Sequence, residues 1–358
     1  MEGIQVRAAI SDYDVLIGRQ IMDRFPELIA GFDPGGELVV VTDDGVDSRY
    51  PELPPLSRTA RRMVLKRGEH LKSFAQAEAL IFELTGWNVS RDGMIIAFGG
   101  GVIGDLAGFV ASIYLRGIPW IAIPTTLVSQ VDSAMGGKVA VNLSYGKNLV
   151  GAFYPPRLVI CDTWFLIELP EPEFVNGLGE VIKTAIIGDP HLFALLEARL
   201  DAILSRDRNV LQTVVAACVK VKADVVSKDE RDRGDRAVLN LGHTVAHALE
   251  AAEGFENVPH GIAVLMGILA VLPLSEGLCG LPRDQSDRIR SLIRRLPVQF
   301  PSSLPPVEAI ETFAAHDKKV RHQRQQWVLL KGIGVPVTGI DVPRDQVRSA
   351  YQSILENR

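Results

Sequence analysis

The sequence predicts an α/β protein with two domains, an N-terminal Rossmann-like domain on a parallel sheet and a mainly α-helical C-terminal domain. In the first half, short β-branched runs alternate with glycine-rich turns and helical patterns, whereas after Asp162 apolar residues recur at helical spacing. The chain has 358 residues, more than the roughly 250 at which one core usually stops growing. We expect one domain at 1–165 and a second, helical domain at 166–358, joined near the LPEP segment at 169–172.

Each predicted element follows from its pattern of apolar residues. The predicted strands are apolar on both faces, as in a parallel sheet that helices cover. They are Glu37–Thr42, Gly93–Phe98, Pro119–Ile123 and Leu158–Cys161. The predicted helices show apolar residues at helical spacing, several of them bounded by Pro or Gly. They are Glu173–Ile187, His191–Ser205, Asn209–Ser227, Thr244–Ala252, Gly261–Glu276, Arg283–Arg295 and Pro343–Glu356.

Composition excludes several classes of protein. With 47% hydrophobic and 23% charged residues, the chain does not have the composition of a disordered protein. A net charge of -5 gives no electrostatic reason to expect nucleic acid or an anionic membrane as a partner. The three widely spaced cysteines, Cys161, Cys218 and Cys279, indicate neither a disulfide framework nor a CxxC metal site.

The N-terminal segment and the apolar runs indicate in which cellular compartment the protein lies. The N-terminus lacks a basic segment followed by an apolar run. The longest uncharged apolar stretches, near 117–131 and 261–275, are shorter than the roughly 20 residues that span a bilayer. We therefore expect a cytoplasmic protein that binds neither a membrane nor nucleic acid.

A glycine-rich turn, GGGVIGD at 99–105, directly follows the predicted strand at 93–98 and precedes a helical pattern. Glycines there let phosphate oxygens approach backbone N–H groups, and the N-terminus of the following helix favours negative charge. The turn is not the usual GxGxxG with an acidic residue about 20 residues later. By itself it is compatible with a dinucleotide site and with a turn that binds nothing.

Three of the seven histidines, His243, His247 and His260, fall close together. His243 and His247 are four residues apart, so they share one face of a helix that begins near Gly242. With a carboxylate such as Glu180 they would supply ligands to a divalent metal. The alternative is that they make core or capping hydrogen bonds, because the spacing lacks the glutamate of an HExxH motif.

Long motifs follow one another over residues 37–335: GGGVIGDLAGF, LRG, PTTLVSQVDSAMGGKVAVNLSYGKNLVGAFYPP, GLGEVIK, KADVVSKDE, LNLGHTVAHALE, PHG and HDKK. Together they closely resemble dehydroquinate synthase and the related sugar phosphate cyclases. In that family Glu180, His243 and His260 match the ligands of a catalytic zinc, for which Co2+ is an alternative. The resemblance thus makes His260, rather than His247, the second histidine ligand. It implies that His247 contacts phosphate and handles protons.

The resemblance also implies the other site residues. The catalytic residues would be Lys183, Lys222, His247 and Asp132. NAD would be bound by Asp43, Glu69, Lys72, Gly101, Gly104, Asp105, Thr125, Thr126, Lys138, Lys147 and Phe165. The substrate would be bound by Arg116, Lys138, Asn148, Arg236, Asn240, Lys318 and Lys319. Arg116 matches an arginine that reaches the phosphate from a neighbouring subunit, which implies a homodimer.

The activity that the resemblance implies is a phosphate-eliminating lyase reaction of the shikimate pathway. It converts the sugar phosphate acid 3-deoxy-D-arabino-heptulosonate 7-phosphate to 3-dehydroquinate by transient NAD oxidation, phosphate elimination, re-reduction and intramolecular aldol closure. Alternatives are a cyclase of secondary metabolism that makes aminodehydroquinate, 2-deoxy-scyllo-inosose or a valiolone, a metal-dependent NAD polyol dehydrogenase, and a catalytically silent homologue.

Three positions depart from the family pattern. Ile262 stands where the family has a glutamate after the third metal ligand, so a polar neighbour of that ligand is expected to be missing. Gly45 replaces an asparagine near the adenosine ribose, which leaves Asp43 as the expected contact. Ala246 replaces a glycine.

Overall fold

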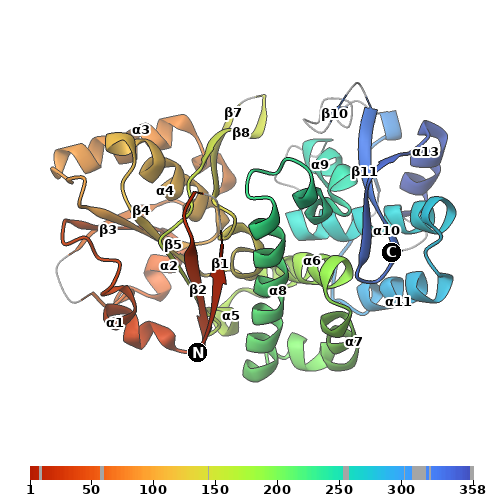
Figure 1. Cartoon of the computed structure of the whole chain (residues 1–358), viewed down its shortest axis with the longest axis horizontal. Helices are drawn as coiled ribbons and strands as arrows, with labels where there is room; N and C mark the ends of the chain where they lie inside the picture. Colours follow the sequence, from red (N-terminus) through yellow and green to blue (C-terminus); the bar gives the residue numbers. More distant parts are fainter. Residues whose placement is uncertain are drawn as a thin grey trace. The chain divides into compact units, whose positions relative to one another are not determined.

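The computed structural model divides the chain into two compact units (Figure 1). The first unit contains Met1–Leu169 and Arg206–Arg231, and the second contains Pro170–Ser205 and Asp232–Arg358. We expected 166–358 to form one domain, but helix α8 (Arg208–Lys228) belongs to the first unit because it packs against the first two strands. The structure describes residues 1–7, 10–56, 60–143, 145–252, 258–301, 303–308, 320–321 and 324–354.

The first unit is built on a seven-stranded sheet with the strand order β1-β2-β9-β6-β5-β3-β4. Only the β1–β2 pair is antiparallel, so the predicted Rossmann-like parallel sheet is confirmed. The strands that we did not predict, β1, β2 and β4, lie at or next to the edges of the sheet. The strands are β1 Glu2–Val6, β2 Tyr13–Gly18, β3 Leu38–Asp43, β4 Ala60–Leu65, β5 Met94–Gly99, β6 Trp120–Pro124 and β9 Leu158–Asp162.

The central strands are buried along their whole length, as their continuous apolar sequences require. The shorter helical elements of the unit are η1 Ile21–Arg24, α1 Phe25–Ile29, α2 Asp44–Arg49, η2 Glu69–Leu71, η3 Tyr114–Arg116, η4 Ser129–Ser133 and α5 Phe165–Glu168. The longer helices are α3 Phe74–Gly86 and α4 Gly101–Ile113. A separate hairpin, β7 (Lys138–Leu143) and β8 (Gly146–Phe153), packs on α4.

The second unit is mainly helical, as predicted. Its helices are α6 Glu171–Gly188, α7 Pro190–Leu204, η5 Asp235–Asn240, α9 His243–Ala252, α10 His260–Cys279, α11 Arg283–Arg294 and α13 Arg344–Gln352. It also contains a small antiparallel sheet that the sequence did not lead us to expect. The strands of this sheet are β10 Val320–Arg321, β11 Arg324–Gly332 and β12 Val335–Asp341.

Helix α10 lies at the centre of the second unit, in contact with α6, α9, α11, α13 and β11. With 20 residues, it is long and apolar enough to cross a membrane by length and composition. The uncharged run near 261–275 in the sequence indicated a shorter segment. However, 72% of its most apolar window is buried within the chain, as is typical of a core helix.

Glycines allow the backbone of two other segments to touch α10. A Cβ on Gly261 would lie 1.8 Å from the Asn176 carbonyl oxygen, and one on Gly179 would lie 2.2 Å from the Gly261 carbonyl oxygen. Farther along α10, a Cβ on Gly267 would lie 2.0 Å from the carbonyl oxygen of Gly242, whose φ is +76°. The helix can therefore meet α6 and the turn before α9 at these separations only with glycine at the contacts.

We predict that Gly267→Ala lowers the free energy of unfolding by about 2 kcal/mol or more, because the added methyl group meets backbone that cannot rotate away. The matched control is Gly277→Ala in the same helix, where a Cβ would meet nothing within 4 Å. That change should be neutral or stabilising, since alanine is the better helix former. Urea unfolding of both variants measures the difference, and equal stabilities would contradict the contact.

Candidate metal centre and the edge of the sheet

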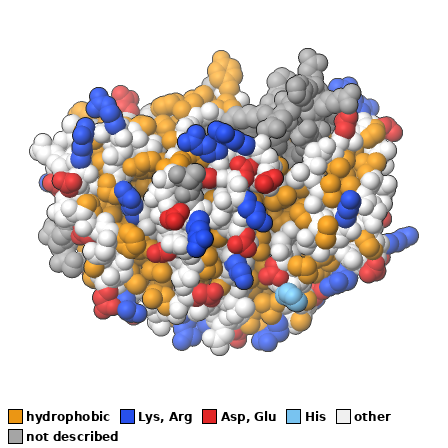
Figure 2. Space-filling model, viewed as in Figure 1, with side chains coloured by type: hydrophobic (Ala, Val, Ile, Leu, Met, Phe, Trp, Pro, Cys, Tyr) orange, Lys and Arg blue, Asp and Glu red, His pale blue; other side chains and the backbone are white. Residues whose placement is uncertain are grey.

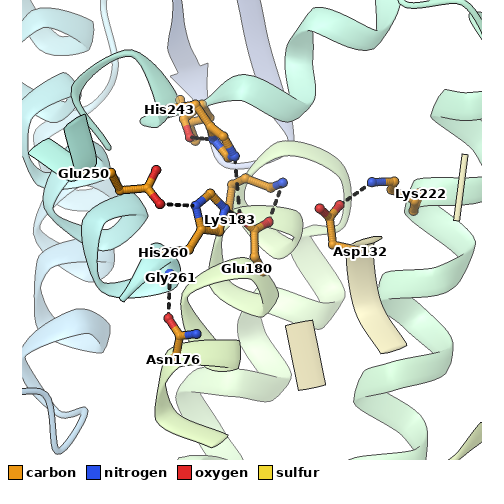
Figure 3. Close-up of polar contacts among 10 residues, drawn as sticks. Asp132, Asn176, Glu180, Lys183, Lys222, His243, Glu250, His260 and Gly261 are labelled. Carbon is orange, nitrogen blue, oxygen red and sulfur yellow. Dashed lines mark hydrogen bonds and ion pairs between the residues drawn. The ribbon is translucent and has the colours of Figure 1, made fainter. Parts of the chain in front are cut away.

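The second unit brings together one carboxylate and two imidazoles from three helices (Figure 3). Glu180 lies in the middle of α6, whereas His243 and His260 are the first residues of α9 and α10. Glu180 Oε1 is 3.5 Å from His243 Nε2 and 3.1 Å from His260 Nε2. One ligand atom from each of the three lies within 4.8 Å of the others, the spacing of a metal-ligand cluster.

The Nδ1 atom of each histidine ligand faces a hydrogen-bond acceptor, which holds the ring in one orientation. His243 Nδ1 lies 3.2 Å from the backbone carbonyl oxygen of Leu241, to which it donates when Nε2 carries no proton. His260 Nδ1 lies 3.5 Å from Glu250 Oε1, and the Glu250 side chain is buried. In both histidines, therefore, Nδ1 faces an acceptor and Nε2 faces Glu180.

The charges of the cluster are strongly perturbed. Burial opposes ionisation of Glu180, but the Lys183 ammonium, 2.6 Å from Glu180 Oε2, and His260 hold the pKa of this carboxyl below its usual range. Burial opposes protonation of His260, but Glu180 and Glu250 raise its pKa to about 10. One carboxylate and two imidazole nitrogens are the donors that Zn2+ takes in catalytic sites, so the residues fit such a cation. A cation would take the place of the proton shared between Glu180 and His260.

The sequence spacing suggested His243 and His247 as joint ligands, and the structure places His247 differently. Its ring centroid is 5.4 Å from that of His243 and 6.4 Å from that of His260. Within the described residues, the cluster with ligand spacing contains His260 and not His247. The geometry thus favours the ligand set that the family resemblance implied.

Two other predicted residues of the second unit lie in the short helix η5. Arg236 is buried and Asn240 is half-buried, on the segment that leads into α9. Lys318 and Lys319 lie outside the described residues. The roles of these four residues as substrate contacts stay predictions.

In the first unit, the predicted cofactor residues gather at the carboxyl ends of neighbouring strands. Asp43 ends β3, the Gly101–Asp105 segment follows β5, and Thr125 and Thr126 follow β6. The chain runs from β3 outward to β4 and then returns to the other side as β5, so β3 and β5 flank the point where the strand order reverses. Ligands of open parallel sheets bind at that point.

A cleft of about 380 Å3, including its open mouth, lies beside this edge. Its walls include Gly101, Gly104, Asp105 and Lys138. Lys72 is buried and contacts both Asp105 and Asn148. Burial raises the pKa of Asp105, against the opposing effect of the Lys72 ammonium.

The remaining predicted residues of this unit occupy varied environments. The Lys222 ammonium, buried on α8, contacts the Asp132 carboxylate in η4, which ties the two segments together. Arg116 is exposed, with a φ of +69°, and Lys147 is half-buried at the start of β8. Phe165 is packed in the core against Phe98, at a ring distance of 5.5 Å, so its predicted contact with a cofactor stays a prediction.

Sequence reasoning missed Glu250, although a signal was present. Glu250 follows His243 by two helical turns, so it lies on the same face of α9. Because of Ile262, we expected His260 to lack a polar neighbour, but the structure supplies one. Ile262 is buried, and the carboxylate that faces His260 Nδ1 comes from Glu250 instead.

The fold and this donor set define an enzyme with a Rossmann-like unit and a helical unit that carries a candidate metal centre. Residues 62–176 match the model of the 3-dehydroquinate synthase N-terminal domain, and residues 177–320 match that of the C-terminal domain. The chain belongs to the 3-dehydroquinate synthase family.

Relatives in that family match most of this chain. It is 40% identical over 341 residues to a 3-dehydroquinate synthase of Geobacter metallireducens, covering 93% of this chain and 94% of the relative. It is 41% identical over 343 residues to that of Desulforamulus reducens, covering 93% and 95%.

Solved structures of sugar phosphate cyclases share the fold. A 2-deoxy-scyllo-inosose synthase complexed with carbaglucose-6-phosphate, NAD+ and Co2+ has a TM-score of 0.88 at 26% identity, covering 99% of this chain and 100% of that one. A 2-epi-5-epi-valiolone synthase of Streptomyces hygroscopicus with NAD+ and Zn2+ has a TM-score of 0.86 at 27% identity, covering 97% of both chains. A probable glycerol dehydrogenase of Sinorhizobium meliloti, at 15% identity and a TM-score of 0.70, shares the fold alone, covering 96% of both chains.

We predict that Glu250→Gln weakens Zn2+ binding by about 10- to 100-fold, because the neutral amide no longer holds His260 Nδ1–H with a full charge. Competition with a chromophoric chelator measures the affinity directly, without turnover. Glu171→Gln, which removes the same charge from an exposed position at the start of α6, is the control and should bind Zn2+ as the wild type does. Equal affinities of the two variants would contradict the role of Glu250.

Proposed function

We propose that this protein is a 3-dehydroquinate synthase. It would act as a phosphate-eliminating lyase of the shikimate pathway, converting 3-deoxy-D-arabino-heptulosonate 7-phosphate to 3-dehydroquinate and phosphate. The observation that carries the proposal is the match of residues 62–320 to the two domain models of that family. The 40–41% identity to synthases over 93% of the chain supports it.

NAD and a divalent metal are the proposed cofactors. Cyclases of the same fold were solved with NAD+ and with Co2+ or Zn2+, which supports both. In this chain, the glycine-rich turn after β5 begins helix α4, whose N-terminus favours a pyrophosphate. Glu180, His243 and His260 would hold the metal. When bound, NAD would exchange hydride with a ring alcohol, and the cation would polarise that alcohol.

Two lysines, one in each unit, have defined tasks in this proposal. Lys183 Nζ, 2.6 Å from Glu180, is fully buried, so its positive charge acts in a medium that screens it weakly. It would stabilise negative charge that develops on a substrate oxygen. Lys222 would act in the same way, with the Asp132 carboxylate orienting its ammonium group. His247 would contact the phosphate and move a proton at its ring nitrogen.

Substrate selection would depend on cations that suit a carboxylate. Arg236 is buried, and its planar fork of N–H donors matches the two oxygens of a carboxylate. The resemblance assigns Lys138, on the wall of the cleft in the first unit, to the substrate as well. Sugar phosphates without a carboxylate offer no group for Arg236, which favours the heptulosonate over glucose 6-phosphate or sedoheptulose 7-phosphate.

The proposal extends to assembly and location. We propose a cytoplasmic homodimer in which the exposed Arg116 reaches the phosphate bound by the partner protomer. Figure 2 shows acidic and basic side chains interspersed over one face of the molecule.

The direct test is phosphate release by the NAD- and Zn2+-loaded protein. We expect release from 3-deoxy-D-arabino-heptulosonate 7-phosphate with no net rise in NADH absorbance, because the hydride returns in each turnover. Chelation should abolish the activity and Zn2+ should restore it. Release only from the amino analogue, glucose 6-phosphate or sedoheptulose 7-phosphate would assign the chain to another cyclase. NADH accumulation with a polyol would make it a dehydrogenase.

A second prediction concerns substrate selection by Arg236. Arg236→Lys keeps the charge but loses the bidentate geometry, so KM for the heptulosonate should rise about tenfold or more. Steady-state kinetics on the loaded enzyme measures the change. The exposed Arg231→Lys is the matched control and should leave KM as it is. An unchanged KM in Arg236→Lys would remove Arg236 from the substrate site.

A further inference from the structure

Asn142 joins two segments that carry predicted cofactor and substrate residues. Its backbone N–H donates to the carbonyl oxygen of Lys72 at 2.6 Å. Its side-chain Nδ2 donates to Glu69 Oε1 at 2.7 Å. Both contacts bind strand β7 to the segment that contains Glu69 and Lys72, the two residues predicted to lie at the cofactor.

On its other side, Asn142 fixes the backbone of Asn148. The Asn148 N–H donates to Asn142 Oδ1 at 3.0 Å, and Asn148 has a φ of +57°, a left-handed conformation that needs support from its surroundings. The Asn148 side-chain oxygen in turn contacts the Lys72 ammonium. The Lys72 backbone N–H donates to the Glu69 carbonyl oxygen at 3.0 Å, so Glu69, Asn142, Asn148 and Lys72 form a closed ring of contacts.

The local register of the hairpin explains why Asn142 is available for these contacts. Val141 pairs with Val150 and Leu143 pairs with Gly146, and the register shifts between these two pairs. Asn142 therefore has no pairing partner in β8. It forms an isolated parallel bridge with Ser73 on its other side, where its N–H donates to Lys72.

We propose that Asn142 is a positioning residue that holds Glu69 and Asn148 together, and so couples the cofactor segment to the substrate segment. The inference rests on the proposed function, since the roles of Glu69 and Asn148 belong to it. A carboxamide provides a donor and an acceptor on one short side chain. An aspartate in its place accepts from Asn148 N–H but repels Glu69, whereas an alanine loses both contacts.

The test is a double-mutant cycle read by NAD binding to the full-length protein. Asn142→Asp should weaken NAD binding about tenfold, because two carboxylates then face each other. In Asn142→Asp with Glu69→Gln, the amide introduced at position 69 can donate to the new carboxylate. The loss in the double variant should therefore be several-fold smaller than the product of the two single losses. Fluorescence titration with NAD measures all four affinities.

The control is Asn209→Asp, the same substitution at an exposed position of α8 in the same unit, which should bind NAD as the wild type does. Unchanged NAD affinity in Asn142→Asp, or losses that simply multiply, would overturn the proposal. A purely structural role would lower the unfolding temperature of Asn142→Asp without rescue by Glu69→Gln, and would overturn it as well.

Turnover separates this inference from the proposed function. If the wild type releases phosphate from the heptulosonate, Asn142→Ala should raise KM for that substrate about tenfold as well as weaken NAD binding, and an unchanged KM would overturn the coupling. If the wild type shows no release but the NAD cycle is non-additive as expected, the proposed function fails and the positioning of Glu69 by Asn142 stands.

Discussion

The candidate metal centre depends on one constraint, the contact of backbone with backbone along helix α10. Each proposed ligand is the sequence neighbour of a glycine at such a contact: Gly179 precedes Glu180, Gly242 precedes His243 and Gly261 follows His260. Asn176 adds a hydrogen bond, since its Oδ1 accepts from the Gly261 N–H at 2.6 Å (Figure 3). Because the ligands start from backbone that cannot separate, their side chains meet with little freedom left to lose when a cation binds.

The same closeness creates an electrostatic cost that the surrounding residues offset. Glu180 is fully buried, and an isolated carboxylate there would be strongly unfavourable. Lys183 lies one helical turn away and pairs with it at 2.6 Å, while His260 is charged because Glu180 and Glu250 raise its pKa to about 10. A bound cation would add two positive charges to this network and would displace that proton. The negative charges that would offset it are those of Glu180 and Glu250.

The sequence predicted the parts of the structure that depend on local pattern. Strands β3, β5, β6 and β9 are apolar on both faces and were found, whereas the edge strand β4, with its two arginines, gave no such signal. Helical spacing pointed to His243 and His247, because it reports only neighbours on one helix. His260 meets Glu180 through a glycine contact between helices 80 residues apart, which no local pattern contains. The family resemblance indicated that pair, but not Glu250 or Asn142, whose roles depend on hydrogen bonds seen only in the folded chain.

The departures from the family pattern at Gly45 and Ile262 change local contacts. Asparagine in place of Gly45 would bring its Cβ to 2.7 Å from Arg67 Cδ, and Arg67 is paired with Asp44 at 3.1 Å, so the glycine accommodates that pair. Asp43 meanwhile accepts from the Gly45 and Val46 N–H groups at 2.9 and 3.0 Å, which fixes its carboxylate at the end of β3. Ile262 fills apolar space beside a histidine that Glu250 already orients. Since none of these positions removes one of the three proposed metal ligands, the chemistry of the family can be retained while the residues that support it differ.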